Sequence, residues 1–231
     1  AFSDVNLKLI AGDVNRVYNA YYDNIRGGRI AYDAAMAKEQ TAPTFEEKAF
    51  HDFHLYTLDQ KVSFANNQTK QLELYPPTNI KAYSEYEYPI YGDGVKSMIK
   101  FKNTKENGAG MPLPKGIIKV YKQDSDGNLE FIGEDSIEHT SKNEEVSINT
   151  GTAFDLVAST RLKEQTQVTK SITERLIQIT LKNNSADKKT IKVTHQLSPN
   201  TRIIDADYKY IQDKNDKVTF SIDIARDQEL V

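Results

Sequence analysis

The sequence contains no cysteine and no tryptophan among its 231 residues. Without cysteine the chain can form no disulfide, and it has no thiolate to act as a nucleophile, a zinc ligand or an iron–sulfur ligand. A bacterial periplasm and a cytosol are both compatible with this composition. The lack of cysteine therefore excludes proteins that depend on disulfides or thiolates, but it does not indicate a cellular compartment.

Long apolar runs and tracts of one charge are also lacking. No stretch approaches the roughly 18 apolar residues of a membrane span, so no transmembrane segment is predicted. Ala1–Asn6 lacks the charged and then apolar pattern of a signal peptide. The 30 basic and 33 acidic side chains are interspersed and give a net charge of −3. Because nucleic-acid binding needs a dense positive patch, no nucleic-acid partner is predicted.

Alternation of apolar and polar residues dominates the chain from about Val95 onward. Its clearest run is Val218–Ile224, and similar segments recur at short intervals, as in β-sandwiches and barrels. Asp126–Gly127 predicts a tight hairpin turn, because glycine tolerates the positive φ that such turns require. We predict a mostly β protein in which residues 92–231 form an antiparallel, immunoglobulin-like β-sandwich domain.

Residues 1–91 show a less regular pattern. Short strands are predicted at residues 7–11, 53–58, 62–64, 71–75 and 80–88. The alanine-rich segment 30–40 predicts a short helix that ends before Pro43. Gly92–Gly94 is the predicted boundary between the sandwich and this smaller β-rich region, which we interpret as the remnant of a preceding domain.

Several segments, taken together and in order, resemble one known family. They are His54–Asp59, Asn67–Gln71, Met111–Gly116, Val120–Lys122, Phe131–Asp135, Ile137, His139–Thr140, Glu145–Val146, Gly151, Ala153–Asp155, Ile179–Asn183 and Leu9–Arg16. The chain is similar, over most of residues 5–231, to the C-terminal half of an uncharacterised bacterial domain-of-unknown-function family allied to the mucoidy-inhibitor A group. The resemblance implies an exported, multi-domain β-sandwich protein of the bacterial envelope, periplasmic or otherwise exported. It brings no catalytic or binding residues to this sequence.

Members of that family usually have a further β domain before the position of Leu7 and a closing strand after that of Val231. The resemblance therefore implies that the chain is a fragment and that the edge next to the missing strand lies open. An open edge invites pairing with another chain. We expect contacts with another protein, or between copies of this one, through such an edge.

The acidic turn at Asp124, Asp126 and Asn128 is a candidate calcium site, because these residues occupy alternate positions as in a calcium-binding loop. That loop needs glycine at its sixth position and glutamate at its twelfth, where this chain has Leu129 and Asp135. A hairpin turn is the favoured interpretation.

Four histidines are candidate ligands or bases. His51 and His54 lie three positions apart, and on a strand this spacing points the rings to opposite faces, against a zinc pair. His139 is a candidate base, but capping of a loop through a hydrogen bond is favoured. His195 is expected to be a partly buried histidine of a sheet.

No catalytic constellation appears. Glu134 and Asp135 point to opposite sides of a strand and cannot act as an acid–base pair across a glycosidic bond. The sequence has no Gly-x-Ser-x-Gly elbow, no phosphate-binding glycine loop and no His-Glu-x-x-His helix. No catalytic residue, cofactor or metal ligand is therefore predicted.

Tyr83, Tyr86, Tyr88 and Tyr91 form a group that is a candidate ligand or interface surface. Exposed aromatic rings stack on sugars, and tyrosine is enriched at protein interfaces. The alternative is that half of the group packs inward and the rest shields an edge.

Three functions remain open from the sequence. The leading one is a non-enzymatic envelope protein whose β-sandwich surfaces make protein–protein or scaffold contacts. The second is a carbohydrate- or peptidoglycan-binding module that uses the tyrosines. The third is an enzyme whose site needs a missing N-terminal domain, which predicts a cleft with converging carboxylates or histidines at the junction of residues 1–90 with the rest.

Overall fold

The computed structural model describes residues 1–12, 45–50 and 53–231, and this part is mostly β with antiparallel sheets, as predicted. Its strands are β1 (Phe2–Val5), β2 (Lys8–Ala11), β3 (Phe45–Phe50), β4 (Phe53–Leu58), β5 (Val62–Phe64), β6 (Tyr83–Pro89), β7 (Lys96–Lys102), β8 (Gly116–Gln123), β9 (Leu129–Ile137), β10 (Glu145–Thr152), β11 (Leu156–Thr169), β12 (Ile172–Asn183), β13 (Lys189–Gln196), β14 (Tyr210–Gln212), β15 (Lys217–Ile224) and β16 (Gln228–Leu230). The predicted helix at residues 30–40 lies outside the described residues. Within them, no helix has the length and apolar character that crossing a membrane requires.

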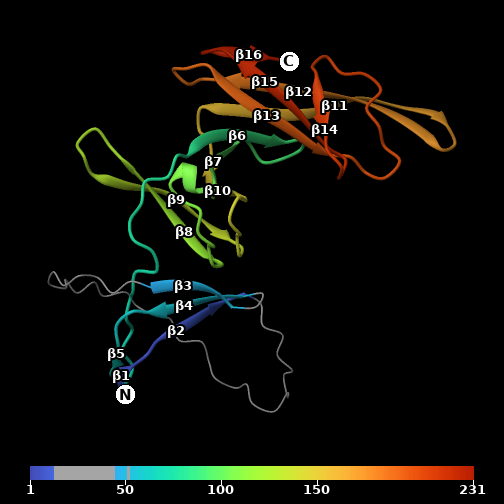
Figure 1. The fold of residues 1–231 in the computed structure, drawn as a ribbon. Coiled ribbons are helices and arrows are strands. Elements are labelled where there is room, and N and C mark those ends of the chain that lie inside the picture. The colour runs from blue at the N-terminus through green and yellow to red at the C-terminus, as the bar shows by residue number, and fades with distance from the viewer. Residues whose placement is uncertain (13–44, 51–52) are drawn as a thin grey trace.

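Six strands form the largest sheet, in the order β10-β7-β6-β13-β15-β14 (Figure 1). Neighbours are antiparallel except β6 and β13, which run parallel with Ile191 opposite Tyr86. The chain passes from β6 to its neighbour β7 through Gly92–Gly94. The predicted boundary between residues 91 and 92 therefore falls in a turn inside this sheet, and the sheet continues across it.

A three-stranded sheet, β11-β12-β16, packs against the β6, β13 and β15 part of the large sheet. The shared core consists of the buried side chains Tyr88, Val95, Leu156, Leu181, Ile191, Val193, Ile222 and Ile224. The alternation predicted for Val218–Ile224 is confirmed: Ile222 and Ile224 belong to this core, Phe220 packs against it and Val218 is buried, whereas Ser221 and Asp223 are exposed. Area removed from water stabilises this packing by about 25 cal/mol per Å².

The β8–β9 hairpin covers the other part of the large sheet, at β7 and β10. A second core cluster joins Phe101, Val146 and Ile148 of that sheet to Ile137 of β9, and Ile118 and Val120 of β8 pack against it. The predicted turn closes this hairpin, with Gly127 at φ +85°. One face of the large sheet is therefore covered by two separate layers.

The N-terminal strands form a smaller unit at the opposite end of the molecule from β11–β12, as Figure 1 shows. β2, β4 and β3 make a three-stranded antiparallel sheet, and β1 pairs with β5. Residues 71–75, for which a strand was predicted, have no regular strand. Pro76 and Pro77 follow directly, and proline disfavours a continued ladder because it lacks a backbone donor.

Candidate functional site

The structure places Tyr83, Tyr86 and Tyr88 of β6 on different sides of the sheet, and Tyr91 lies in the turn after the strand. Tyr88 is buried in the larger core, where its hydroxyl lies 2.9 Å from Thr160 Oγ1, and Tyr86 packs against the same core. Tyr83 and Tyr91 are exposed. The alternation of side chains along β6 produces this split, so the four rings do not make one surface and half of the group packs inward.

Tyr83 belongs to a network of charges on the uncovered face of the large sheet. Glu85 lies at its centre, where Lys100 Nζ approaches Oε1 at 2.6 Å and Lys192 Nζ contacts the other carboxylate oxygen. The Tyr83 hydroxyl donates to Glu145 Oε2 at 3.0 Å, and Lys100 Nζ lies 3.8 Å from Glu145 Oε1. Four neighbouring strands therefore contribute to one chain of ion pairs.

Glu87 lies two residues after Glu85 on the same face of β6 and extends this network. Its Oε1 accepts hydrogen bonds from Thr194 Oγ1 and Lys217 Nζ, each at 3.0 Å. Glu87 and Glu85 thus tie β6 to its parallel neighbour β13 and to β15 beyond it.

The pKa values of the network show that the ion pairs outweigh the cost of burial. Burial raises the pKa of Glu85, but hydrogen bonds from Lys100 and Lys192 more than offset this and hold the pKa below its ordinary value. The pKa of Glu87 is lowered in the same way by Lys217 and Thr194 against burial. Burial lowers the pKa of Lys100, but Glu85 raises it overall. The charged groups of this network therefore hold one another in their ionised forms.

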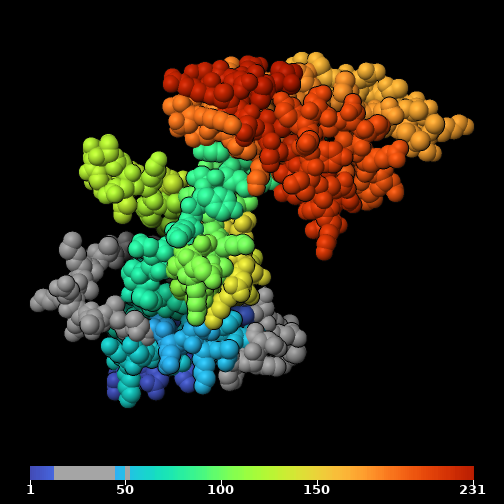
Figure 2. Space-filling model, turned by 45° about the horizontal axis from the view of Figure 1, so that its top comes forward, coloured from blue at the N-terminus to red at the C-terminus, as the bar shows by residue number. Residues whose placement is uncertain are grey.

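Four exposed apolar side chains lie on the outer face of the β8–β9 hairpin. Ile117, Tyr121, Leu129 and Phe131 have exposed fractions of 68%, 51%, 70% and 53%. The rings of Tyr121 and Phe131 lie opposite each other across the hairpin, with centroids 5.6 Å apart and planes at 65°. Figure 2 shows this hairpin projecting from the body of the molecule. We call these four side chains the hairpin surface.

The tip of the same hairpin is the turn that was weighed as a calcium site. Asp124 Oδ1 accepts hydrogen bonds from the backbone N–H groups of Asp126 and Asn128, both at 2.9 Å. The carboxylate is therefore engaged in closing the turn. Among the described residues no group of three or more histidine, cysteine, aspartate or glutamate side chains is arranged to hold a metal ion.

A cluster of titratable groups lies where the N-terminal sheet meets the loops before β8 and β10. His54 Nδ1 lies 2.8 Å from Glu47 Oε1, and Lys142 Nζ lies 3.8 Å from Glu47 Oε2. Beside them, the Tyr56 hydroxyl donates to the Pro112 carbonyl at 3.1 Å. The cluster therefore joins the two parts of the chain through specific polar contacts.

Tyr75 completes the cluster from the segment after β5. Its hydroxyl lies 2.9 Å from that of Tyr56 and also contacts the Pro112 carbonyl. Burial is the main cause that raises the pKa of both tyrosines. Both are therefore neutral hydrogen-bonding groups at physiological pH.

Two shallow hollows in the described part of the chain lie away from this cluster, along Ile203–Tyr210 and around Phe2 and Phe64.

The other candidate residues have structural contacts. His139 Nδ1 accepts a hydrogen bond from the Lys115 N–H at 3.1 Å, as expected for a loop cap. Asp135 Oδ2 accepts the N–H of Asn149, on the edge strand β10, at 2.8 Å. His195 lies opposite Val218 and is half-buried, whereas His51 lies outside the described residues.

Two buried asparagines were missed from the sequence. Asn183 Nδ2 donates to the carbonyls of Asp187, Ile224 and Ala225 at 2.8, 3.2 and 3.1 Å. Asn103 Nδ2 donates to the carbonyls of Met111 and Ser141 at 2.6 and 3.0 Å. Each holds a loop beside one of the two cores. Asn183 begins a run of polar residues typical of a turn, but the burial of its amide depends on distant strands.

Comparison with known proteins adds no relative. No protein-family model, no curated protein and no solved structure matches the chain.

Proposed function

We propose that this protein is a non-enzymatic component of the bacterial envelope that contacts other proteins through the hairpin surface. The observation that carries the proposal is the exposure of Ile117, Tyr121, Leu129 and Phe131 on one face of a projecting hairpin. Contiguous exposed apolar side chains rimmed by polar groups are typical of interaction sites. Tyr121, Phe131 and Leu129 adjoin one another on this face with Gln123 opposite Leu129, and the Lys119–Glu134 pair, whose charged groups lie 4.0 Å apart, separates them from Ile117.

Protein is favoured over sugar as the ligand of this surface by the arrangement of its rings. Aromatic residues are enriched in the centres of protein interfaces, where they fill pockets of a partner. A sugar ring stacks on one flat platform, whereas Tyr121 and Phe131 meet at 65°. The proposed envelope location is supported by the resemblance of segments such as His54–Asp59 to the family allied to the mucoidy-inhibitor A group. The proposed immunoglobulin-like class is supported by the packing of two sheets on a shared core.

The test is comparative capture from bacterial envelope extracts. The immobilised wild-type chain is compared with a Tyr121→Ser/Phe131→Ser variant and with a Lys122→Ser/Glu130→Ser control. The control residues are also exposed and lie opposite each other on the other face of the hairpin. We expect a protein that the wild type and the control capture equally and that the Tyr121/Phe131 variant loses. Capture that is equal for all three, or no reproducible capture at physiological salt, contradicts the proposal.

A carbohydrate-binding function is the alternative, and the exposure of Tyr83 and Tyr91 favours it. A glycan array that includes peptidoglycan fragments tests it. Binding that is lost in a Tyr83→Ala/Tyr91→Ala variant supports the alternative, whereas an array without signal removes it.

A further inference from the structure

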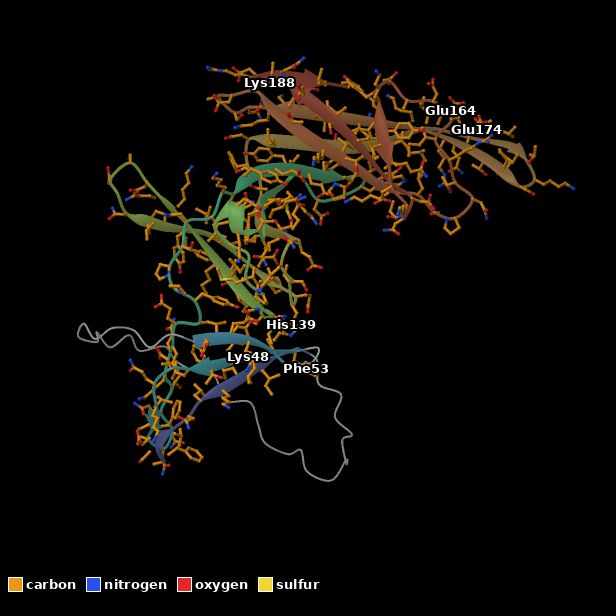
Figure 3. The ribbon with its side chains drawn as sticks, in the orientation of Figure 1. Lys48, Phe53, His139, Glu164, Glu174 and Lys188 are labelled. Atoms are coloured by element: carbon orange, nitrogen blue, oxygen red, sulfur yellow. The ribbon has the colours of Figure 1, made fainter. Side chains whose placement is uncertain are left out.

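The β11–β12 hairpin projects beyond the sandwich core and leaves one regular backbone edge open. All residues of β12 from Ile172 to Asn183 have partners in β11, but on its other side β12 pairs only at Leu181–Asn183, with β16. In the described part of the chain, no backbone hydrogen bond joins Ile172–Thr180 to any element other than β11. Figure 3 labels Glu164 and Glu174 along the projecting part of the hairpin.

The two edges of this hairpin differ in how they are protected. Both register irregularities lie on β11, where Lys163 and Val168 have no partner in β12. Bulges and lysines are devices by which edge strands avoid pairing with other chains. β12 has no such interruption, and its Ile172 and Leu176 are exposed. The open edge of β12 is thus the one suited to a further strand.

We propose that a second copy of this chain pairs with this edge, β12 against β12, around a two-fold axis at Leu176. A two-fold axis makes the same strand antiparallel to itself. Successive residues turn their backbone groups to alternate edges, so opposed residues must lie an even number of positions apart. One residue of β12 must therefore lie opposite its own copy.

An axis at Leu176 allows every residue of the open edge, Ile172–Thr180, to pair with the second copy. With Leu176 on the axis, Ile172 lies opposite Thr180, and the new pairing ends where β16 begins at Leu181. The pairing then extends the β11–β12 sheet into a continuous sheet of both copies. It uses β16 of each copy as a stop.

Neighbouring registers are less favourable. An axis at Glu174 or Arg175 sets like charges directly opposite each other, which destabilises a strand pair. An axis at Ile177 sets Thr173 opposite Leu181, whose edge is already occupied by β16. In the Leu176 register Arg175 lies only diagonal to its own copy, and its Nε donates across the hairpin to Gln165 Oε1 at 2.9 Å.

This pairing is independent of the hairpin surface, which lies on β8–β9. A failure of one proposal therefore leaves the other standing. Loss of self-association in a β12 variant is expected to leave capture of an envelope protein unchanged.

Sedimentation velocity over a concentration series tests the proposal with two matched variants. Leu176→Asp places two carboxylates opposite each other at the axis. Val168→Asp adds the same charge on β11 at a side chain of similar exposure, 51% against 60% for Leu176. We expect a reversible dimer of the wild-type chain that Leu176→Asp weakens about tenfold or more and Val168→Asp does not change.

A second measurement uses the absence of cysteine in the chain. Cβ atoms directly opposite in an antiparallel pair lie about 4.5–5.5 Å apart, within reach of a disulfide after small movements. Leu176→Cys is expected to form a disulfide-linked dimer under mild oxidation much faster than Val168→Cys. A wild-type chain that is monomeric at every concentration, equal weakening by both aspartates, or equal cross-linking by both cysteines overturns the proposal.

Discussion

The hairpins β8–β9 and β11–β12 are both antiparallel strand pairs packed on the large sheet, but they expose different chemical groups. β8–β9 packs one face on the smaller core and presents apolar side chains on the other. β11–β12 packs its base on the larger core, whereas its projecting end presents a backbone edge. The first hairpin offers side chains to a partner and the second offers hydrogen-bonding groups. The comparison teaches that two hairpins packed on one sheet can expose different features, apolar side chains in one and backbone groups in the other.

The largest expected effect is a loss in the free energy of unfolding when the same Ile→Ala change is made in each of the two cores. Ile191→Ala in the larger core and Ile148→Ala in the smaller core each remove buried methyl groups. Each is expected to lower the free energy of unfolding by about 2–5 kcal/mol, and Ile191→Ala by more because its core is larger. Urea denaturation measures both, with exposed Ile211→Ala as the control that changes little. An Ile148→Ala variant as stable as the control would show that β8–β9 is not packed on the sheet.

The buried asparagines sharpen the same comparison. Asn183→Ala and Asn103→Ala each leave carbonyl groups without donors beside one of the cores. We expect each change to lower the free energy of unfolding by about 1–3 kcal/mol. Denaturation curves of the two variants, with exposed Asn66→Ala as the control, measure this. Equal stability of all three would mean that water replaces these side chains at no cost.

The charged face of the large sheet gives a smaller effect that depends on pH. The folded-state pKa values of Glu85 and Glu87 are lowered. Their contribution to stability is therefore complete above the unfolded pKa of about 4.3 and is lost as pH falls through the folded pKa. The pKa of Lys100 is raised, so its contribution is present below about 10.4 and is lost as pH rises through its folded pKa.

Glu85→Gln tests this assignment. The variant is expected to be about 1–2 kcal/mol less stable than wild type at neutral pH. The difference should narrow in acid, as the pH falls below the unfolded pKa of about 4.3 and through the lowered folded pKa of Glu85, where the wild-type carboxylate becomes protonated. Urea denaturation at both pH values measures it, with Glu229→Gln, an exposed ion-pair residue, as the control. A difference that stays constant with pH would contradict a stabilising role for the charge.

The smallest expected effect is on the exposed parts of the two hairpins. Leu129→Ser in the hairpin surface and Leu176→Ser at the open edge remove side chains that are exposed in the monomer. Thermal unfolding in dilute solution should show changes within about 0.5 kcal/mol. A larger loss for either variant would place that side chain in a core instead of at a contact site.

Local patterns were enough to predict several parts of this fold. The alternation in Val218–Ile224 identified a strand and its buried face, and Asp126–Gly127 identified a hairpin. The order of strands was not predictable, because the parallel pairing of β6 with β13 joins segments about a hundred residues apart. For the same reason Gly92–Gly94 was interpreted as a boundary although it connects two paired strands.

The candidate site was predictable only in part, for a related reason. Tyr83 and Tyr91 are exposed, but the composition of β6 alone could not show that Tyr88 meets Thr160 in a core. The hairpin was predicted but the hairpin surface was not, because alternation does not say which of two apolar faces remains uncovered. Asn183 is a turn residue by sequence and a buried anchor only by tertiary contact.

Hydrogen exchange of the backbone amides tests most directly the central claim that each hairpin has a packed part and an open part. In dilute solution the hydrogen-bonded amides of Ile179–Asn183 should exchange only with global unfolding, and those of Glu164–Thr169 by local opening. At high concentration Ile172–Leu176 should become protected while Glu164–Thr169 does not. Uniformly slow exchange along the whole β11–β12 hairpin in dilute solution would contradict the account.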